Sequence, residues 1–277
     1  MLAFFQHNAP RYLLTGVLIG LSGTAFGQGT TSPVLLDNCG HQLTFTTPPQ
    51  RVVTVGQATT EILYSLQLHD RVVGTSNWFT DIADEFREVN AGIEQIADNF
   101  PSFESVVSKR PDLVTADFLF TVGPQGVVGK REQFHSLGVN TYVLASQCIN
   151  QDSSRGSDGV RSAMFRLDDL YQSIRDIATV FSVLDRGEHL ISNLRSRESA
   201  AVERAGRLNM DGVSAVFWYS SADLEMDPWV AGSRGVPGWM MRTLGIRNII
   251  ESNEVWPSVG WESIARANPD IIVIAEM

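Results

Sequence analysis

The sequence predicts an α/β protein of two lobes, each a parallel-type sheet flanked by helices, joined by one long helix. Short β-branched runs alternate with helical segments along most of the chain. Two similar segments flank the expected long helix: Glu104 recurs as Glu262 and Pro111 as Pro269, at one offset of 158 residues (262 − 104 and 269 − 111). The helix itself is predicted by apolar residues spaced three or four apart, namely Leu167, Leu170, Ile174, Ile177, Phe181 and Leu184.

The periodic stripe alone would also fit an ordinary core helix. Because related segments lie on both sides of it, we expect it to connect two related halves. Arg186 and Gly187 mark an expected break, after which apolar residues resume towards Arg197.

Composition is that of a globular protein large enough for two domains. The 277 residues are 43% hydrophobic and 19% charged. The formal net charge of −10 argues against a nucleic-acid partner.

The first residues have the pattern of an export signal. Arg11 precedes an apolar run over 12–21, and small residues at 25–27 resemble a cleavage site. The run is too short to predict a membrane span. We therefore expect residues 1–27 to be a cleaved signal peptide and the mature protein to be a soluble resident of a Gram-negative periplasm. No cysteine lies near the cleavage point, which argues against a lipid anchor.

The two cysteines, Cys39 and Cys148, are candidates for a disulfide because an oxidising compartment permits one. Two separate buried thiols are the alternative. Neither cysteine belongs to a CxxC motif, so redox catalysis is not indicated.

The first half, residues 28–160, is expected to form the N-terminal lobe. Strands are predicted at 51–55, 72–73, 113–116 and 141–144, with helices at 61–68 (capped by Thr59 or Thr60) and 130–137. Residues 161–206 form the expected helical linker.

Residues 207–277 form the expected C-terminal lobe. Its strands are predicted at 213–217, 248–250 and 271–275, and its helices at 238–244 and from Trp261. Residues 229–230 lead to a glycine-rich turn. The first half continues through Cys148 after the strand that corresponds to 271–275. We therefore expect the second lobe to be incomplete, as in a truncated product.

Ligand-binding residues are expected where strands end, because ligands of open α/β sheets bind at the carboxyl ends of strands. Grouped aromatic side chains there suit a large, rigid, partly apolar ligand, although each one could instead be a core anchor. The residues at these ends are Gln57, Trp78, Phe118, Phe120, Trp218, Tyr219 and Trp256.

Arg234 lies in a glycine-rich loop, 231–235, and could contact an anionic group. The loop resembles a hydrolase nucleophile motif, but no histidine follows Ser233, as a hydrolase would require. The five histidines are scattered without metal-ligand spacing. We expect no catalytic residue, no metal ligand and no cofactor, so the protein is not expected to be an enzyme.

Glu104 and Glu262 each fall in the first turn of an expected helix. The helix dipole favours a carboxylate at that position, which is a sufficient structural explanation. The pair could equally form a two-point acidic clamp for arginines of a partner protein.

The chain resembles the periplasmic solute-binding proteins of ABC importers for ferric siderophores, cobalamin and haem, whose two lobes are joined by one long helix. The resemblance rests on the export signal, the opening RVVTVGQATTEILYSLQLHDRVVG, the two E-x₆-PD segments, the linker helix and the segment VWPSVGWESIARANPDIIV. It implies that Glu104 and Glu262 dock to the permease dimer. It also implies ligand contacts from Trp78, Phe100, Phe118 and Trp256.

The expected function is capture of an iron chelate, a ferric siderophore, and delivery to an inner-membrane ABC importer by a monomeric protein. The aromatic loops, with Arg161 and Arg234, favour a siderophore over a bare ion. A corrin also suits aromatic walls, and Trp256-Pro257 resembles the cobalamin subgroup. Cobalamin and haem therefore stay open as alternatives. An enzyme and a partner-sensing subunit without a small ligand are the other two classes considered.

Overall fold

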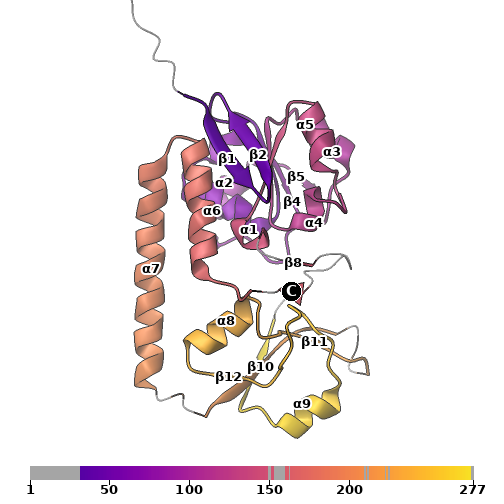
Figure 1. Cartoon of the computed structure of the whole chain (residues 1–277), viewed down its shortest axis with the longest axis vertical. Helices are drawn as coiled ribbons and strands as arrows, with labels where there is room; N and C mark the ends of the chain where they lie inside the picture. The colour runs from indigo at the N-terminus through magenta and orange to yellow at the C-terminus, as the bar shows by residue number, and fades with distance from the viewer. Residues whose placement is uncertain are drawn as a thin grey trace, which may run out of the picture. The chain divides into compact units, whose positions relative to one another are not determined.

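The structure is a computed structural model that describes residues 32–275 apart from 149, 150, 153–159, 162, 209, 211, 222 and 224. The expected signal peptide at 1–27 lies outside these residues. Figure 1 gives the order of the elements along the chain.

The first sheet has five parallel strands in the order β5-β4-β3-β6-β7. Their bounds are β3 (Val52–Val55), β4 (Val72–Ser76), β5 (Gln95–Ala97), β6 (Leu113–Ala116) and β7 (Asn140–Val143). The four strands predicted for this half are confirmed within about one to three residues at each end. The three-residue strand β5 was not predicted, because too few residues carry its pattern.

Helices cover both faces of this sheet, as a parallel sheet requires. Neighbouring residues of one strand belong to different hydrophobic cores: Val52 and Leu113 to one, Val53 and Val114 to the other. The helices of this region are α1 (Gln57–Ser65), α2 (Arg87–Asn90), α3 (Phe103–Ser108), α4 (Leu119–Val122) and α5 (Arg131–Ser136), with 3-10 turns η1 (His69–Arg71), η2 (Asp84–Phe86) and η3 (Ala145–Gln147).

An antiparallel hairpin, β1 (Val34–Asn38) and β2 (His41–Phe45), precedes the sheet. Its turn is joined to the end of the first sheet by a disulfide between Cys39 and Cys148, with Cα atoms 4.6 Å apart. The expected pairing is therefore confirmed. Asn38 reinforces the connection, since its Nδ2 donates to Val143 O (2.7 Å) and its Oδ1 accepts from Val143 N (2.9 Å).

The expected single linker helix is in fact two helices, α6 (Leu167–Val180) and α7 (Leu184–Arg207). The predicted stripe is real, but Ile174 and Ile177 belong to the core beneath the first sheet. The break falls at Ser182, whose φ is 58°, and not at Arg186-Gly187. A Cβ on Gly187 would lie 2.7 Å from Ala178 Cβ, so this glycine permits close packing of α7 on α6. The 24-residue α7 is the long element that leads to the second sheet.

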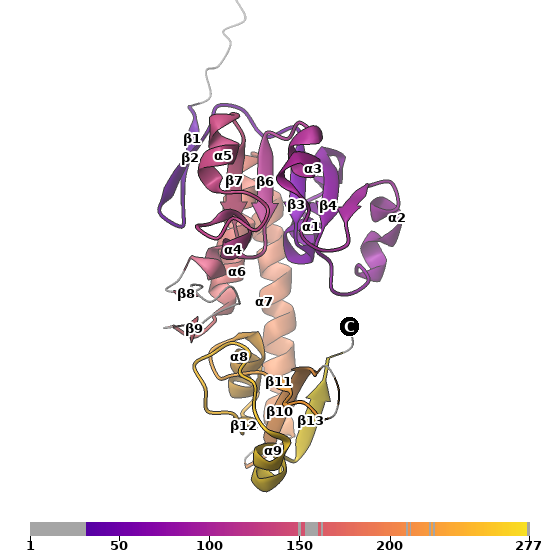
Figure 2. The same ribbon diagram turned by 90° about the vertical axis from the view of Figure 1, so that its right-hand side faces the viewer.

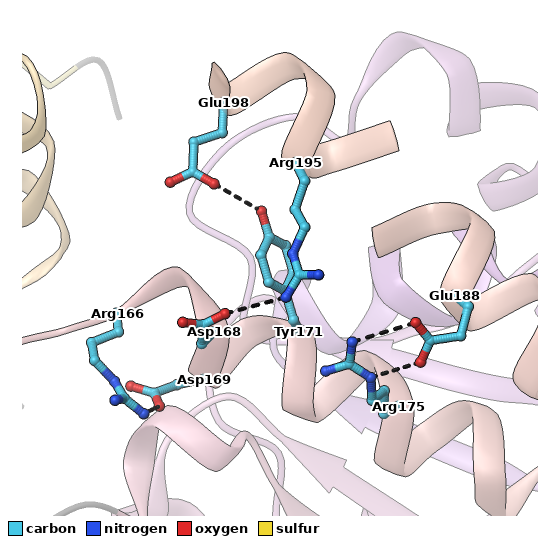
Figure 3. A network of polar contacts seen from close by, with 8 residues as sticks. All are labelled: Arg166, Asp168, Asp169, Tyr171, Arg175, Glu188, Arg195 and Glu198. Carbon is cyan, nitrogen blue, oxygen red and sulfur yellow. Dashed lines mark hydrogen bonds and ion pairs between the residues drawn. The ribbon is translucent and has the colours of Figure 1, made fainter. Parts of the chain in front are cut away.

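Polar contacts join the two helices in antiparallel register (Figure 3). Arg175 Nε lies 2.6 Å from Glu188 Oε1, Arg195 Nη2 lies 3.4 Å from Asp168 Oδ1, and Tyr171 OH donates to Glu198 Oε2 at 3.2 Å. The two ion pairs are largely exposed and contribute about 0–1 kcal/mol each. The buried side chains between the helices, with Ile191 among them, therefore carry most of the stabilisation.

The second sheet is smaller and centred on β10 (Ser214–Ser220). Strands β12 (Arg247–Asn248) and β13 (Ile271–Ile274) pair with it in parallel, and β11 (Trp229–Val230) pairs antiparallel. Helices α8 (Val236–Thr243) and α9 (Trp261–Ala267) accompany this sheet, as Figure 2 shows. Two short strands, β8 (Gln151–Asp152) and β9 (Val160–Arg161), form a separate ribbon in the connector. The expected domain bounds at 160 and 206 stay predictions.

The repeat predicted from the sequence is present in the structure. Strand β13 begins and ends 158 residues after β6, and α3 and α9 precede them. Arg110 and Asn268, 158 residues apart, both have left-handed φ values, 49° and 44°. Strand β6 lies between two neighbours, whereas β13 pairs only with β10 among the described strands, and Ile274 is 64% exposed.

Candidate ligand-binding site

The carboxyl ends of β3, β4 and β6 bring Gln57, Trp78 and Phe118 to one edge of the first sheet. This follows from the parallel order of the strands, in which equivalent ends share an edge. The expectation that these three residues lie at strand ends of one sheet is met. Their contact with a ligand stays a prediction.

Four phenylalanines form a continuous row at this edge. Phe118 stacks on Phe120 with ring centroids 5.2 Å apart and meets Phe79 edge to face at 6.4 Å. Phe120 in turn meets Phe100 edge to face at 5.5 Å. Phe118, Phe120 and Phe100 are half-buried, and Phe79 is 48% exposed. The row therefore offers an aromatic surface that remains open to solvent.

Polar contacts hold the loop that follows β4. Gln57 Nε2 donates to Asp81 O (3.1 Å), and Thr80 Oγ1 donates to Gln57 Oε1 (3.2 Å). Trp78 Nε1 donates to Thr75 Oγ1 (2.7 Å), which fixes its indole. Gln57 therefore lies at the strand ends and also holds the loop that carries Trp78 through these two hydrogen bonds.

A cavity of about 1100 Å³ lies beside this loop. It is large enough for a drug-sized or larger ligand. Its lining mixes aromatic, amide and charged side chains: Trp78, Phe79, Thr80, Asp81, Ile82, Arg87, Asn90, Gln95 and Asp98.

Asp117, directly before Phe118, is a site residue that sequence reasoning missed. Its carboxylate accepts the backbone N–H groups of Ala58 and Thr59, each at 2.9 Å, and so caps α1 from the end of a neighbouring strand. Burial raises the pKa of Asp117 to about 6, although these N–H donors lower it. The predicted cap by Thr59 or Thr60 is wrong, because this long-range carboxylate takes that role. The one local sign in the sequence that α1 begins in an unusual way is Gly56, directly after the β-branched strand.

The second sheet presents its aromatic residues in two separate pairs. Trp218 and Tyr219 are consecutive in β10, so their side chains point to opposite faces. Tyr219 stacks on Trp256 at 4.5 Å, whereas Trp218 meets Trp261 of α9 edge to face at 4.9 Å. Tyr219 and Trp256 therefore form a stacked pair, and Trp218 packs against a helix on the other face.

The two arginines expected near the ligand tie loops together. Arg234 Nη1 donates to Arg161 O (2.6 Å), and Phe165 N donates to Arg234 O (2.9 Å). Arg161 is only 4% exposed, and its Nη2 donates to Ser146 O. Both arginines therefore connect loops of the fold through these hydrogen bonds. Arg161 is too buried to form an open binding surface.

Glu104 and Glu262 are exposed in the first turns of α3 and α9. Ser102 caps α3 by accepting the N–H of Ser105 (3.1 Å). The two carboxylates therefore occupy equivalent, solvent-facing positions of the repeat. Their proposed contact with a partner stays a prediction.

Within the described residues, no three side chains of His, Cys, Asp or Glu are grouped closely enough to hold a metal ion. The helices of the described part are also too short or too polar to cross a lipid bilayer.

This fold, with aromatic side chains at the strand ends of two sheets, is that of an α/β ligand-binding protein. A model of the periplasmic binding protein family matches residues 52–277, so the chain belongs to that family. The family resemblance expected from the sequence is thereby confirmed, and membership supports a location outside the cytoplasm.

One curated relative is the uncharacterized ABC transporter substrate-binding lipoprotein YvrC of Bacillus subtilis, 24% identical over 88% of this chain and 69% of the relative. A solved structure of an ABC-type Fe3+-hydroxamate transport system from Saccharomonospora viridis has a TM-score of 0.69 and 22% identity, covering 87% of this chain and 79% of that one.

Two further solved structures share the fold. The periplasmic heme-binding protein RhuT from Roseiflexus has a TM-score of 0.61 at 23% identity, covering 81% of this chain and 76% of its own. The vitamin B12 binding protein BtuF of Vibrio cholerae has a TM-score of 0.59 at 18% identity, covering 83% and 78%.

Proposed function

We propose that this protein captures an iron chelate, a ferric siderophore, between its two lobes in the periplasm and delivers it to an inner-membrane ABC importer. The observation that carries the proposal is the row of Phe79, Phe118, Phe120 and Phe100 at the strand ends of a periplasmic binding protein. Such a surface suits the apolar framework of a bulky, rigid ligand. The likeness to an Fe3+-hydroxamate transport protein supports the choice of ligand.

Binding without chemical conversion is part of the proposal. The iron is cargo held by its chelator, so the protein needs no metal ligands of its own. Transport then requires only that the chelate be bound and released.

Cobalamin or haem is the second candidate. An outer ring face of the stacked pair Tyr219 and Trp256, whose centroids are 4.5 Å apart, would suit the plane of a corrin or porphyrin. Proteins that bind haem and vitamin B12 share the fold, which keeps both ligands open.

A tryptophan-fluorescence titration of the mature protein tests the ligand. The chain has six tryptophans to report binding. We expect a ferric trihydroxamate to bind with a sub-micromolar Kd and Phe118→Ala to weaken it by about tenfold, the loss of one aromatic contact. Tight binding of cyanocobalamin or haemin alone would select the second candidate. No binding below the micromolar range by any of the three would reject the chelate proposal.

Docking to the permease is proposed for Glu104 and Glu262, and it has its own test. The double change to Gln should leave the Kd for the ligand unchanged while stopping uptake in cells that depend on that ligand. The matched control changes the exposed Glu85 and Glu225 to Gln, which should leave both binding and uptake intact. Uptake that survives the Glu104 and Glu262 changes would remove the docking role.

Two further parts of the proposal concern the mature protein. We expect the periplasmic protein to lack residues 1–27, which the mass of protein purified from the periplasm checks. We expect it to be a monomer, which light scattering checks with and without ligand.

A further inference from the structure

A second cavity, of about 340 Å³, lies between the β1–β2 hairpin and the start of α5. Figure 2 shows the hairpin next to α5 and β7. The cavity shares no lining residue with the one beside Trp78. Its lining includes three basic side chains, His41, Lys130 and Arg131, together with Glu132 and the 122–124 turn.

Arg131 is the unusual member of this lining. Its side chain is 2% exposed, and its guanidinium donates only to neutral groups: Nη1 to Thr141 O (2.8 Å) and Nη2 to Asn38 Oδ1 (2.8 Å). Among the described residues, no carboxylate lies within ion-pair distance of Arg131, and Nε has no hydrogen-bond acceptor. A buried cation without a counter-ion is unfavourable, and burial lowers the pKa of Arg131 to about 10.

Other basic side chains gather around it, although the chain as a whole has a formal net charge of −10. Lys130 is one of only two lysines in the chain, and His41 lines the same cavity. His135 is close enough that, after burial, Arg131 and His41 lower its pKa. Glu132 and Asp37 act in the opposite sense by favouring the charged form of Arg131.

We propose that this cavity binds a small oxyanion, of the class of phosphate, sulfate or a carboxylate, between Lys130, His41 and Arg131. Glu132 and Asp37 favour the charged form of Arg131, but neither forms an ion pair with it. The anion would add negative charge beside the guanidinium, held by charge-assisted hydrogen bonds from Lys130 and His41. The volume also leaves room for accompanying water. This site is separate from the proposed chelate site, so either can fail without the other.

Thermal unfolding and calorimetry of the mature protein at neutral pH, with sodium chloride balancing the ionic strength, test the proposal. Inorganic phosphate, sulfate and acetate are the probes. We expect a saturable rise in Tm and measurable heat with at least one of them. Binding of acetate alone would assign the site to carboxylates, and binding of phosphate or sulfate alone would assign it to tetrahedral anions.

Variants at exposed or half-buried positions of the lining keep the test independent of folding. Lys130→Gln and His41→Gln together should weaken binding by about tenfold or more, the effect of losing one charge-assisted contact, while leaving the Tm without anion nearly unchanged. Lys109→Gln is the control, because Lys109 pairs with Glu94 outside the cavity. The Nε–H resonance of Arg131 in arginine-labelled protein should shift on saturation.

Two results would overturn the proposal. One is the absence of saturable stabilisation beyond that of chloride for all three anions. The other is equal binding by the Lys130 and His41 variant and by the Lys109 control, which would show an adventitious ion only.

Discussion

The carboxylate of Asp117 lies directly over Gly56 and joins the ends of two neighbouring strands. A Cβ placed on Gly56 would lie 2.1 Å from Asp117 Cγ, closer than any real contact, and Gly56 has a φ of 136°. Asp117 can therefore accept the N–H groups of Ala58 and Thr59 only because residue 56 has no side chain. This pair fixes the start of α1, and with it Gln57, relative to Phe118.

Gly56→Ala should lower the free energy of unfolding by about 3 kcal/mol, from backbone strain and from the clash with Asp117. Urea denaturation measures the loss. Gly138→Ala is the matched control, because Gly138 also has a positive φ (74°) but has nothing within 4 Å of an added Cβ. It should cost about 1 kcal/mol, from backbone strain alone. Equal losses for the two variants would show that the contact with Asp117 is unimportant.

Asp117→Asn should change how stability depends on pH. Burial raises the pKa of Asp117 from 3.8 to about 6, so between these values the folded state binds the proton more tightly than the unfolded state. The contribution of Asp117 is fully present below about pH 4 and is lost as pH rises through about 6. The unfolding free energy of Asp117→Asn minus that of the wild type should therefore rise by about 2 kcal/mol from pH 4 to pH 7.

Denaturation at half-unit pH steps gives that difference directly, and any lost hydrogen bond adds only a constant offset. Asp270→Asn serves as the control. The Ser214 side chain and N–H donate to Asp270 and lower its pKa below 3.8, so its difference should be flat from pH 5 to pH 7. A flat profile for Asp117→Asn as well would contradict the raised pKa.

The close contact of α6 and α7 predicts opposite effects for the same substitution within one helix. Gly187→Ala should destabilise by about 1 kcal/mol, since the added methyl would lie 2.7 Å from Ala178 Cβ. Gly206→Ala, also in α7 but with open space around it, should stabilise by about 0.5 kcal/mol through helix propensity. Adding Ala178→Gly should recover part of the loss at Gly187. Stabilisation by both alanines would mean that the helices do not meet at Gly187.

Sequence reasoning predicted the strands well because their signal is local. Strand β6 covers the predicted residues, Leu113–Ala116, and the repeat gave β13 at the same offset. The repeat also carries a contact that no local pattern reveals. Asp112 accepts the N–H groups of Gln50 and Arg51, and Asp270 accepts that of Ser214, so each Pro-Asp fixes the start of the neighbouring strand.

The errors concern contacts between distant residues. The sequence predicts a helix break at Gly187 because glycine disfavours helices, whereas the role of this glycine depends on its contact with Ala178 in another helix. The candidate site shows the same limit. Strand ends identified Phe118 and Tyr219, but the pairing of Phe118 with Phe120 and of Tyr219 with Trp256 depends on how loops fold over the sheets.

Removal of the disulfide should lower the free energy of unfolding by more than any of the substitutions above. Cys39 and Cys148 are 109 residues apart, and closing a loop of that length stabilises by about 4–5 kcal/mol on the chain-entropy model. We expect Cys39→Ser with Cys148→Ser to lower the free energy of unfolding by several kcal/mol in urea. A reducing agent should destabilise the wild type by a similar amount and leave the double variant unaffected, because no other cysteine exists in the chain. If the reductant left the wild-type midpoint unchanged, the hairpin would be held by the contacts of Asn38 with Val143 instead of by the covalent bond.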